Sequence, residues 1–571
     1  MIRISELKLP LDHAVEALPE LAAQTIGVAP AQFQSFHLFK RSFDARKAEL
    51  LQVHIVDVAL DASLEAELLA RHAGNPHIRP APDMAYCAPT AAPARLPLRP
   101  VVVGFGPCGM FAALMLAKMG FKPIVIERGK KVRERTKDTW GLWRKSELHA
   151  ESNVQFGEGG AGTFSDGKLY SQIKDPRFLG RTVMTEFVKA GAPEDILVAA
   201  HPHIGTFKLV KVVEHMREQI IALGGEIRFQ QRVTDLAIED GQLQGATVLD
   251  QATGQSYDLA VDHLVLALGH SARDTFAMLH TRGVYLEAKP FSIGFRIEHP
   301  QGLIDRARWG RHAGHPLLSA ADYKLVHHAA NDRSVYSFCM CPGGTVVAAT
   351  SEPGRVVTNG MSQYSRNERN ANAGIVVGIT PDDYPQDAAA LRAAMGDDVT
   401  TAVPPGQTSH PLAGIVLQRQ LESAAYVLGG GTYEAPGQLV GDFIAGRAST
   451  ALGSVEPSYK PGVRLGDLST ALPAYAITAI REALPVFGRK IKGFDLHDAV
   501  LTGVETRTSS PLKISRGDDF QSLNVRGLYP AGEGASYAGG ILSAGVDGIR
   551  VAEAVALSVV AGQAATRLRP R

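Results

Sequence analysis

The chain has 571 residues, enough for two or three domains, and 45% of them are hydrophobic. Its 59 Lys and Arg side chains balance 58 Asp and Glu, so no overall charge attracts nucleic acid or an anionic membrane. The chain has no long apolar run, no signal-peptide pattern at its N-terminus, and only four cysteines. These features predict a cytoplasmic protein with reduced thiols and no membrane span.

Residues 1–95 predict a small α+β domain that ends in a proline-rich linker or surface strap. We expect strands at Ile2–Leu9, Phe33–Phe39 and Leu50–Leu60, and helical segments at Leu11–Ile26 and Leu64–Arg71. A basic cluster lies between the second and third strands and has two interpretations, a nucleic-acid patch or a solvated turn. It consists of Lys40, Arg41, Arg46 and Lys47. The domain has no basic excess, which favours the turn.

A dinucleotide-binding βαβ unit follows. The β-branched run Val101–Val103 leads into Gly104-x-Gly106-x-x-Gly109, an Ala- and Leu-rich helix pattern, and a second apolar run that ends in Glu127. Gly104 permits a tight turn, Gly106 lets the backbone approach a pyrophosphate, and Gly109 lets the helix pack closely on the strand. The helix N-terminus offers free N–H groups to phosphates, and Glu127 is placed to hold ribose hydroxyls.

A second glycine-rich loop spans residues 157–167, with five glycines in eleven positions. Such a loop lets the backbone crowd against a ligand. Gly160 and Gly162 are therefore candidate cofactor contacts, and the polar residues Ser165, Asp166 and Lys168 are candidate catalytic groups. A flexible surface loop is the alternative interpretation.

The remaining elements predict how the chain is divided. A helix at Leu209–Leu223, a β-meander with turns at Asp240-Gly and Thr253-Gly, and a buried strand ending at Gly269 complete the first part of the dinucleotide-binding domain, residues 96–275. Residues 276–494 predict an inserted substrate or cap domain rich in antiparallel strands, and residues 495–571 return to the first sheet and end in a helix from Ile541 to Val560.

The inserted domain contributes further elements. Phe291–Glu298 alternates as an antiparallel strand does, and Pro342-Gly-Gly predicts a hairpin turn. Ala388–Met395 and Leu472–Leu484 have helical patterns. Gly429-Gly-Gly431 resembles a nucleotide loop only superficially, because no helix follows it.

These segments together resemble a known fold. The GxGxxG motif with Glu127, the strand end at Gly269, the segment Ala531-Gly-Glu533 and Ala538-Gly-Gly-Ile541 at the start of the terminal helix resemble the FAD-binding fold of glutathione-reductase-like and p-hydroxybenzoate-hydroxylase-like flavoproteins. More specifically, the chain resembles a bacterial group of FAD-dependent, NAD(FAD)-utilising dehydrogenases. The segments similar to that group also include residues 159–168, 203–206, 269–274, 341–344 and 505–511.

The resemblance implies an FAD site. Its residues would be Gly104, Gly106, Pro107, Gly109, Glu127, Arg128, Gly160, Gly162, Val233, Gly269, Gly532, Glu533, Gly539, Gly540 and Ile541. Val233 would meet the adenine through its backbone. Glu533 would bond the ribityl hydroxyls or a phosphate, and because Glu stands here in place of the commoner Asp, its contact atom stays open. Gly540 and Ile541 would present N–H groups near the flavin N1–C2=O edge, where a helix N-terminus stabilises the charge of reduced flavin.

Few protein acids or bases are needed beside a flavin, because the flavin itself transfers hydride at N5. The catalytic candidates are Ser165, Asp166, Lys168, Glu505 and Arg507. Arg507 could clamp a substrate carboxylate, or Glu505 and Arg507 could form structural ion pairs. Cys339-x-Cys341 would put two thiols on one face of a strand. That pattern leaves open a dithiol, a lone active-site thiol at Cys341, or simple packing.

The sequence therefore predicts an α/β FAD-dependent oxidoreductase of a small organic substrate. No second GxGxxG domain is present, so NAD(P)H would bind transiently at the flavin face. The alternatives are a flavin monooxygenase, an RNA-modifying or RNA-binding flavoprotein that uses the N-terminal module, and a flavin-sensing regulatory protein. No metal-ligand spacing is present, so we expect no metal. Substrate identity, reaction direction and oligomeric state stay open.

Overall fold

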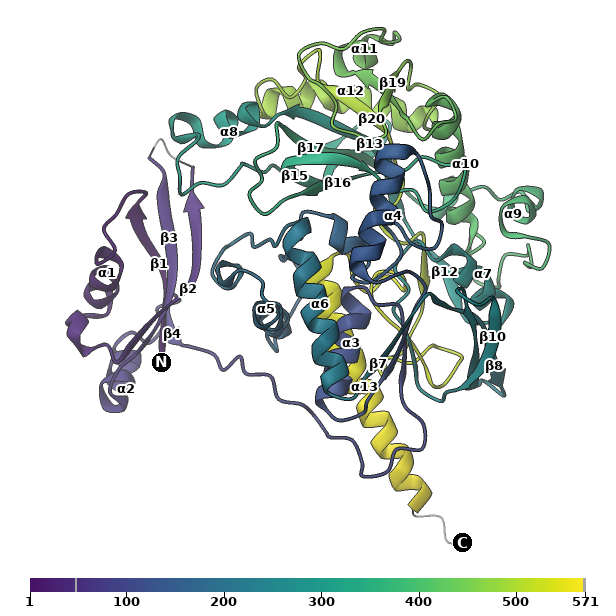
Figure 1. Ribbon diagram of the computed structural model, residues 1–571. Coiled ribbons are helices and arrows are strands. Elements are labelled where there is room, and N and C mark those ends of the chain that lie inside the picture. The colour runs from purple at the N-terminus through teal and green to yellow at the C-terminus, as the bar shows by residue number, and fades with distance from the viewer. Residues whose placement is uncertain (47–48, 568–571) are drawn as a thin grey trace.

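The computed structural model describes residues 1–46 and 49–567 (Figure 1). The N-terminal domain contains β1 (Ile2–Pro10), α1 (Ala17–Ile26), β2 (Ser35–Asp44), β3 (Leu51–Ala59), α2 (Ala62–Arg71) and β4 (Ile78–Pro80). Its antiparallel sheet has the order β2-β3-β1-β4, and both helices cover the face that is turned away from the rest of the molecule (Figure 1). The α+β prediction is therefore confirmed, although α1 begins at Ala17 rather than at Leu11.

Two members of the basic cluster of this domain are held by neighbouring residues. Arg41 exchanges backbone hydrogen bonds with Val198 and Ala200, at 2.7 and 3.0 Å. Arg46 forms an ion pair with Asp44 at 2.6 Å. Lys47 lies outside the described residues.

The proline-rich segment runs as an extended strap along the second domain (Figure 1). The Ala92 N–H donates to the Met119 carbonyl at 2.7 Å. Tyr86, Ala92 and Leu96 pack against the helices of that domain. The strap therefore ties the N-terminal domain to the surface of its neighbour.

A five-stranded parallel sheet has the order β22-β11-β5-β6-β7. Its strands are β5 (Val101–Val103), β6 (Ile124–Glu127), β7 (Glu226–Phe229), β11 (Leu264–Leu266) and β22 (Leu528–Pro530). Val102 packs against the helical side, whereas Val101 and Val103 pack on the opposite side. This two-sided burial explains why β5 is apolar throughout.

The two faces of this sheet are covered differently. Figure 1 shows α3 (Pro107–Lys118), α6 (Thr206–Ala222) and α13 (Ile541–Arg567) side by side on one face. An antiparallel meander covers the other face, with β8 (Gln231–Glu239), β9 (Gln242–Asp250) and β10 (Gln255–Ala260). Its turns fall at the two predicted dipeptides.

Three further helices connect or flank these layers, α4 (Val132–Lys145), α5 (Leu179–Lys189) and α7 (Arg273–Thr281). A two-stranded antiparallel sheet joins β12 (Leu286–Ala288) to β21 (Leu512–Ile514). This small sheet links the segment before the inserted strands to the segment after them.

An eight-stranded, mostly antiparallel sheet stands above the first. Its path is β14-β15-β17-β13-β20-β18-β19, with β16 paired to β15. The strands are β13 (Phe291–Pro300), β14 (Val326–His328), β15 (Ser334–Ala348), β16 (Thr358–Ser362), β17 (Asn370–Ile379), β18 (Ala435–Leu439), β19 (Val463–Leu465) and β20 (Val500–Glu505).

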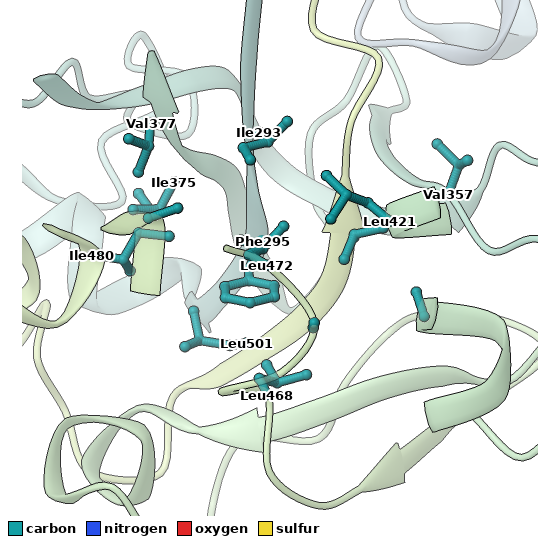
Figure 2. Packing of buried hydrophobic residues seen from close by; sticks show 14 of the residues in the cluster. Ile293, Phe295, Val357, Ile375, Val377, Leu421, Leu468, Leu472, Ile480 and Leu501 are labelled. Atoms are coloured by element: carbon teal, nitrogen blue, oxygen red, sulfur yellow. The ribbon is translucent and has the colours of Figure 1, made fainter. Parts of the chain in front are cut away.

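Five helices accompany this sheet. They are α8 (Gln301–Trp309), α9 (Ala388–Met395), α10 (Ala413–Leu428), α11 (Val440–Ala445) and α12 (Ala474–Lys490). Figure 2 shows the core between them, where Phe295 and Leu501 of the central strands meet Leu472 and Ile480 from the α12 region. All four side chains are buried.

The prediction of a hairpin at Pro342-Gly-Gly is wrong. β15 continues through these residues as one strand, with register shifts against β17 between Phe338 and Cys341 and between Cys341 and Gly344. Gly343 has φ +42°, and a Cβ there would lie 1.7 Å from the Arg366 carbonyl oxygen. The glycines therefore allow a bulge and a close chain crossing instead of a turn.

None of the described helices combines the length and the apolar character that crossing a bilayer requires. Within the same described residues, no group of three or more His, Cys, Asp or Glu side chains is arranged to hold a metal ion.

Candidate active site

A cavity of about 980 Å³ lies where the parallel sheet, the eight-stranded sheet and the N-terminal domain meet. All the predicted cofactor-binding residues except Gly109 line it, and so do all five catalytic candidates. Gly109 lies behind the wall. A Cβ there would fall 1.9 Å from the Gly104 carbonyl oxygen and 3.3 Å from Ala267 Cβ, so its role is the close packing of α3 on the strands.

Two glycine-rich loops form one end of the cavity. Gly104 (φ +97°) makes the turn after β5, and Gly106 is the N-cap of α3. Gly160 (φ +61°) lies against Gly106, and a Cβ at Gly160 would be 2.8 Å from Gly106 Cα. The resulting backbone cradle at a helix N-terminus is a shape that binds phosphate.

The return segment reaches the same end. A Cβ at Gly162 would lie 3.0 Å from Ile541 Cγ1 and 3.5 Å from Pro107 Cγ. Gly532 (φ +68°) packs against Cys108, with 2.8 Å between a Cβ built at Gly532 and the Cβ of Cys108. The first and last parts of the domain therefore build one site, and its shape fits a dinucleotide whose phosphates lie at the α3 N-terminus.

Glu127 is buried at the end of β6, and its carboxylate is fixed by backbone donors. The Phe105 and Gly129 amides donate to it at 2.8 Å each, and the Gly157 amide donates at 3.0 Å. The carboxylate thus ties the first glycine turn to the second while it faces the cavity. Its partly free lone pairs suit ribose hydroxyls.

Two further residues predicted to contact the cofactor differ in whether their groups are already bonded within the protein. The Arg128 guanidinium is paired with Glu151 at 2.8 Å and with Asp274 at 2.8 Å. Val233 lies on β8 in the cavity wall, buried except for that edge. Backbone contact to a ligand is therefore open at Val233, whereas the Arg128 side chain is already engaged.

Glu533 follows the tight turn after β22. Burial raises the pKa of its carboxyl to about 7, and the nearby Lys289 only partly opposes this effect. The side chain therefore changes charge near neutral pH, next to the glycines that precede α13.

The catalytic candidates of the second loop are held by hydrogen bonds. The Ser165 hydroxyl donates to the Gly162 carbonyl at 2.7 Å and accepts from the Gly167 amide at 3.0 Å. Asp166 forms a bidentate ion pair with Arg366, whose Nε lies 2.9 Å from Oδ1. Although burial alone raises the pKa of Asp166, Arg366 lowers it below its ordinary value.

Lys168 projects from this loop toward β15. Its Nζ donates to the Met340 carbonyl and lies 3.8 Å from Asp166. Burial lowers the pKa of Lys168, but the neighbouring Cys339, Cys341 and Asp166 raise it above its ordinary value. Lys168 is therefore a partly buried cation that shares the Asp166 carboxylate with Arg366.

Glu505 and Arg507 lie at the end of β20, and both are buried. Glu505 is paired with Arg296 at 2.6 Å. Arg507 makes two 3.0 Å bonds to Glu422 and also donates to Ser271 and Ser351, at 3.0 and 2.7 Å. Most of its donors are therefore satisfied within the protein, which favours the structural interpretation. To bind a substrate carboxylate, Arg507 would have to give up one of these hydrogen bonds.

Two residues of the cavity wall were noted in the sequence but not predicted as site residues. Cys339 lines the cavity, whereas Cys341, the candidate lone thiol, is buried behind it. Lys40 of β2 reaches the mouth of the cavity from the N-terminal domain. The partners Arg296, Arg366 and Glu422 have no local sequence signal.

Models of known protein families match most of the chain. A model described as "FAD binding domain" matches residues 99–275, and one described as "FAD-dependent protein, C-terminal domain-like" matches residues 290–508. A domain of unknown function matches residues 1–59.

Solved structures show weaker similarity. E. coli quinol fumarate reductase is 12% identical, with a TM-score of 0.34, over 82% of this chain and 73% of its own. The 3-ketosteroid-delta4-(5alpha)-dehydrogenase of Rhodococcus jostii is 13% identical, with a TM-score of 0.32, over 83% of this chain and 99% of its own.

One relative covers nearly the whole chain. It is an uncharacterized protein of Clostridium beijerinckii, 44% identical over 554 residues, which are 97% of this chain and 98% of the relative. The chain therefore belongs to the same family as this Clostridium beijerinckii protein, and its FAD binding domain makes it an FAD-dependent oxidoreductase.

Proposed function

We propose that the protein oxidises or reduces a small organic substrate by hydride transfer at N5 of bound FAD, with NAD(P)H as a transient electron partner. The observation that carries the proposal is the continuous cavity. It extends from the glycine cradle at α3, past Glu533 and Gly540, to a mouth between three segments of the chain.

The protein's own groups would bind and orient the cofactor. Gly104, Gly106 and Gly160 leave room for the pyrophosphate, and Glu127 would hold the adenosine ribose. Gly540 and Ile541 stand at the start of α13, whose N-terminal dipole favours negative charge on a reduced flavin.

Charges at the mouth support an anionic partner. Lys40 of β2, Arg308 of α8 and Lys324 before β14 all line it and are exposed. Among the described residues, none of the three forms an ion pair with a carboxylate. Unpaired cations at a cavity mouth attract phosphate and carboxylate groups, and NAD(P)H carries phosphates.

The first test is the colour of the purified protein and its response to NADH and NADPH without oxygen. We expect a yellow protein whose flavin absorption bleaches with one of the two. A colourless protein that cannot be reconstituted with FAD would refute the proposal, as would a yellow protein that neither nucleotide bleaches. Oxygen uptake coupled to hydroxylation of a product would instead support the monooxygenase.

A second test addresses the mouth. Lys40→Gln and Lys324→Gln should raise the KM for the nucleotide about threefold to tenfold each and leave kcat unchanged, because the cations attract the ligand without touching the reacting atoms. Lys137→Gln, an exposed lysine of α4 away from the cavity, is the matched control. Added salt should shrink the difference between variants and control.

A further inference from the structure

The cavity wall formed by β15 contains an unusual backbone turn at Cys339. This residue has φ +43°, in the left-handed region that non-glycine residues seldom adopt. The register shift between Phe338 and Cys341 surrounds it. Such conformations persist only where the surroundings hold them, and they concentrate at functional sites.

Two cations, the buried Arg296 and the partly buried Lys168, hold this turn from two sides. Arg296 of β13 donates through Nη1 to the Cys339 carbonyl at 2.9 Å, and Lys168 donates to the carbonyl of the next residue, Met340. Arg296 is itself oriented by Glu505 and by Asn359, whose Oδ1 accepts at 2.9 Å. The bulge is therefore clamped between the second glycine-rich loop and the central strand of the upper sheet.

Two thiols flank the bulge, one that lines the cavity and one behind it. Cys339 lines the cavity, and Cys341 is fully buried. The Cys341 thiol donates to the Cys339 carbonyl at 3.3 Å. Gly360 leaves room for the inner thiol, since a Cβ there would lie 3.0 Å from Cys341 Sγ.

The surroundings also shift the pKa values of the two thiols in opposite directions. The neighbouring Cys341 side chain and the charges of Lys168 and Arg296 together outweigh burial and hold the pKa of Cys339 well below its ordinary value. The neighbouring Cys339 side chain and burial raise the pKa of Cys341 well above its ordinary value. A thiolate beside a protonated thiol is the arrangement from which thiol–disulfide chemistry proceeds.

We propose that Cys339 and Cys341 form a redox-active pair that exchanges two electrons with the flavin bound in the same cavity. The inference rests on the proposed function, because it requires FAD. It assigns the pair a catalytic role that neither packing nor a lone thiol at Cys341 would provide.

In the oxidising direction, the cysteine pair gives two electrons to the flavin. The S–H bond of Cys341 breaks, the proton on Cys339 has already left, and an S–S bond forms between the two sulfur atoms. Two electrons and one proton pass to oxidised FAD, and the other proton is in solvent. In the reverse direction, the reduced cofactor returns the two electrons and the S–S bond breaks.

The test is an anaerobic titration of the oxidised, FAD-loaded protein with dithionite. The wild-type protein should take up four electrons per FAD, two for the flavin and two for the disulfide. Cys339→Ser and Cys341→Ser should take up only two. Cys87→Ser, which changes an exposed cysteine on the strap, should still take up four.

A second measurement needs no variant, and therefore does not depend on the folding of Cys341→Ser. The oxidised wild-type protein is denatured and alkylated, and the peptide that contains both cysteines is weighed. We expect this peptide unalkylated and two hydrogen atoms lighter than its reduced form, with Cys87 alkylated. Full alkylation of both cysteines, together with an uptake of two electrons, would overturn the pair.

The two proposals fail in distinguishable ways. A yellow protein that NAD(P)H bleaches but that takes up only two electrons refutes the cysteine pair and leaves the proposed function standing. A colourless protein that cannot be reconstituted refutes both.

Discussion

Glu127 offers the sharpest test of the cofactor site, because its carboxylate is both a structural acceptor and a candidate ribose ligand. In Glu127→Ala three buried amides lose their acceptor, those of Phe105, Gly129 and Gly157. A hydrogen bond to a charged group contributes about 1.5–3 kcal/mol. Because water from the cavity can reach the vacated space, we expect the lower end for the three bonds, about 4.5 kcal/mol of lost stability.

Glu127→Gln separates the two roles. Its amide oxygen can still accept from Gly129 and Gly157, and only the Phe105 amide then faces an NH₂ group. We expect a loss of about 1–3 kcal/mol in stability. If the carboxylate also binds the ribose, FAD affinity should fall about tenfold or more, since each 1.4 kcal/mol is about a factor of ten.

Two assays distinguish these effects. Urea denaturation of the FAD-free protein measures stability, and titration with FAD, followed by quenching of its fluorescence, measures Kd. Glu226→Gln is the control, a half-exposed carboxylate at the start of β7 that does not line the cavity. Unchanged FAD affinity in both Glu127 variants would refute the ribose role, and unchanged stability would refute the structural one.

Three other perturbations follow from the geometry. Glu422→Ala leaves two buried arginines without their shared carboxylate, so denaturation should show a loss of about 3–5 kcal/mol, and an unchanged midpoint would contradict the network. The Glu533 carboxyl has a raised pKa of about 7. Because an anionic cofactor favours the protonated form, FAD affinity should be highest below pH 7 and fall as the pH rises through it, and Glu533→Gln should flatten this profile; a wild-type affinity independent of pH from 6 to 9 would count against it. Gly109→Ala should abolish FAD retention, because its Cβ would lie 1.9 Å from the Gly104 oxygen, whereas Gly466→Ala, with open space around it, should retain the flavin colour; retention by both would contradict the packing argument.

The parts of the site that sequence predicted are those with local signals. The turn at Gly104, the helix start at Gly106 and the acid at Glu127 lie within one βαβ unit, so their spacing alone defines their geometry. The return segment around Gly532 has a similar signal in its strand–turn–helix pattern. The structure places all of these around one cavity.

The parts that sequence missed depend on distant partners. Asp166 is paired with Arg366, 200 positions away, and nothing near either residue indicates the other. The alternation of side chains along a strand would put Cys339 and Cys341 on one face, but the bulge in β15 breaks it and leaves only Cys339 in the cavity. Irregularities of this kind depend on what crosses the strand, and the chain at Arg366 crosses β15 at Gly343.

The split cofactor site has a consequence for the order in which the protein can mature. Gly548 of α13 packs against α3, with only 2.3 Å between a Cβ built at Gly548 and the Cys108 carbonyl oxygen. The glycine turn before α3 leaves the ribosome more than 400 residues before the helix that packs against α3. A nascent chain therefore carries an unsupported half-site while the upper sheet is being made. Flavin capture at the proposed site would therefore require α13 to have been made, although the glycine turn before α3 is made much earlier.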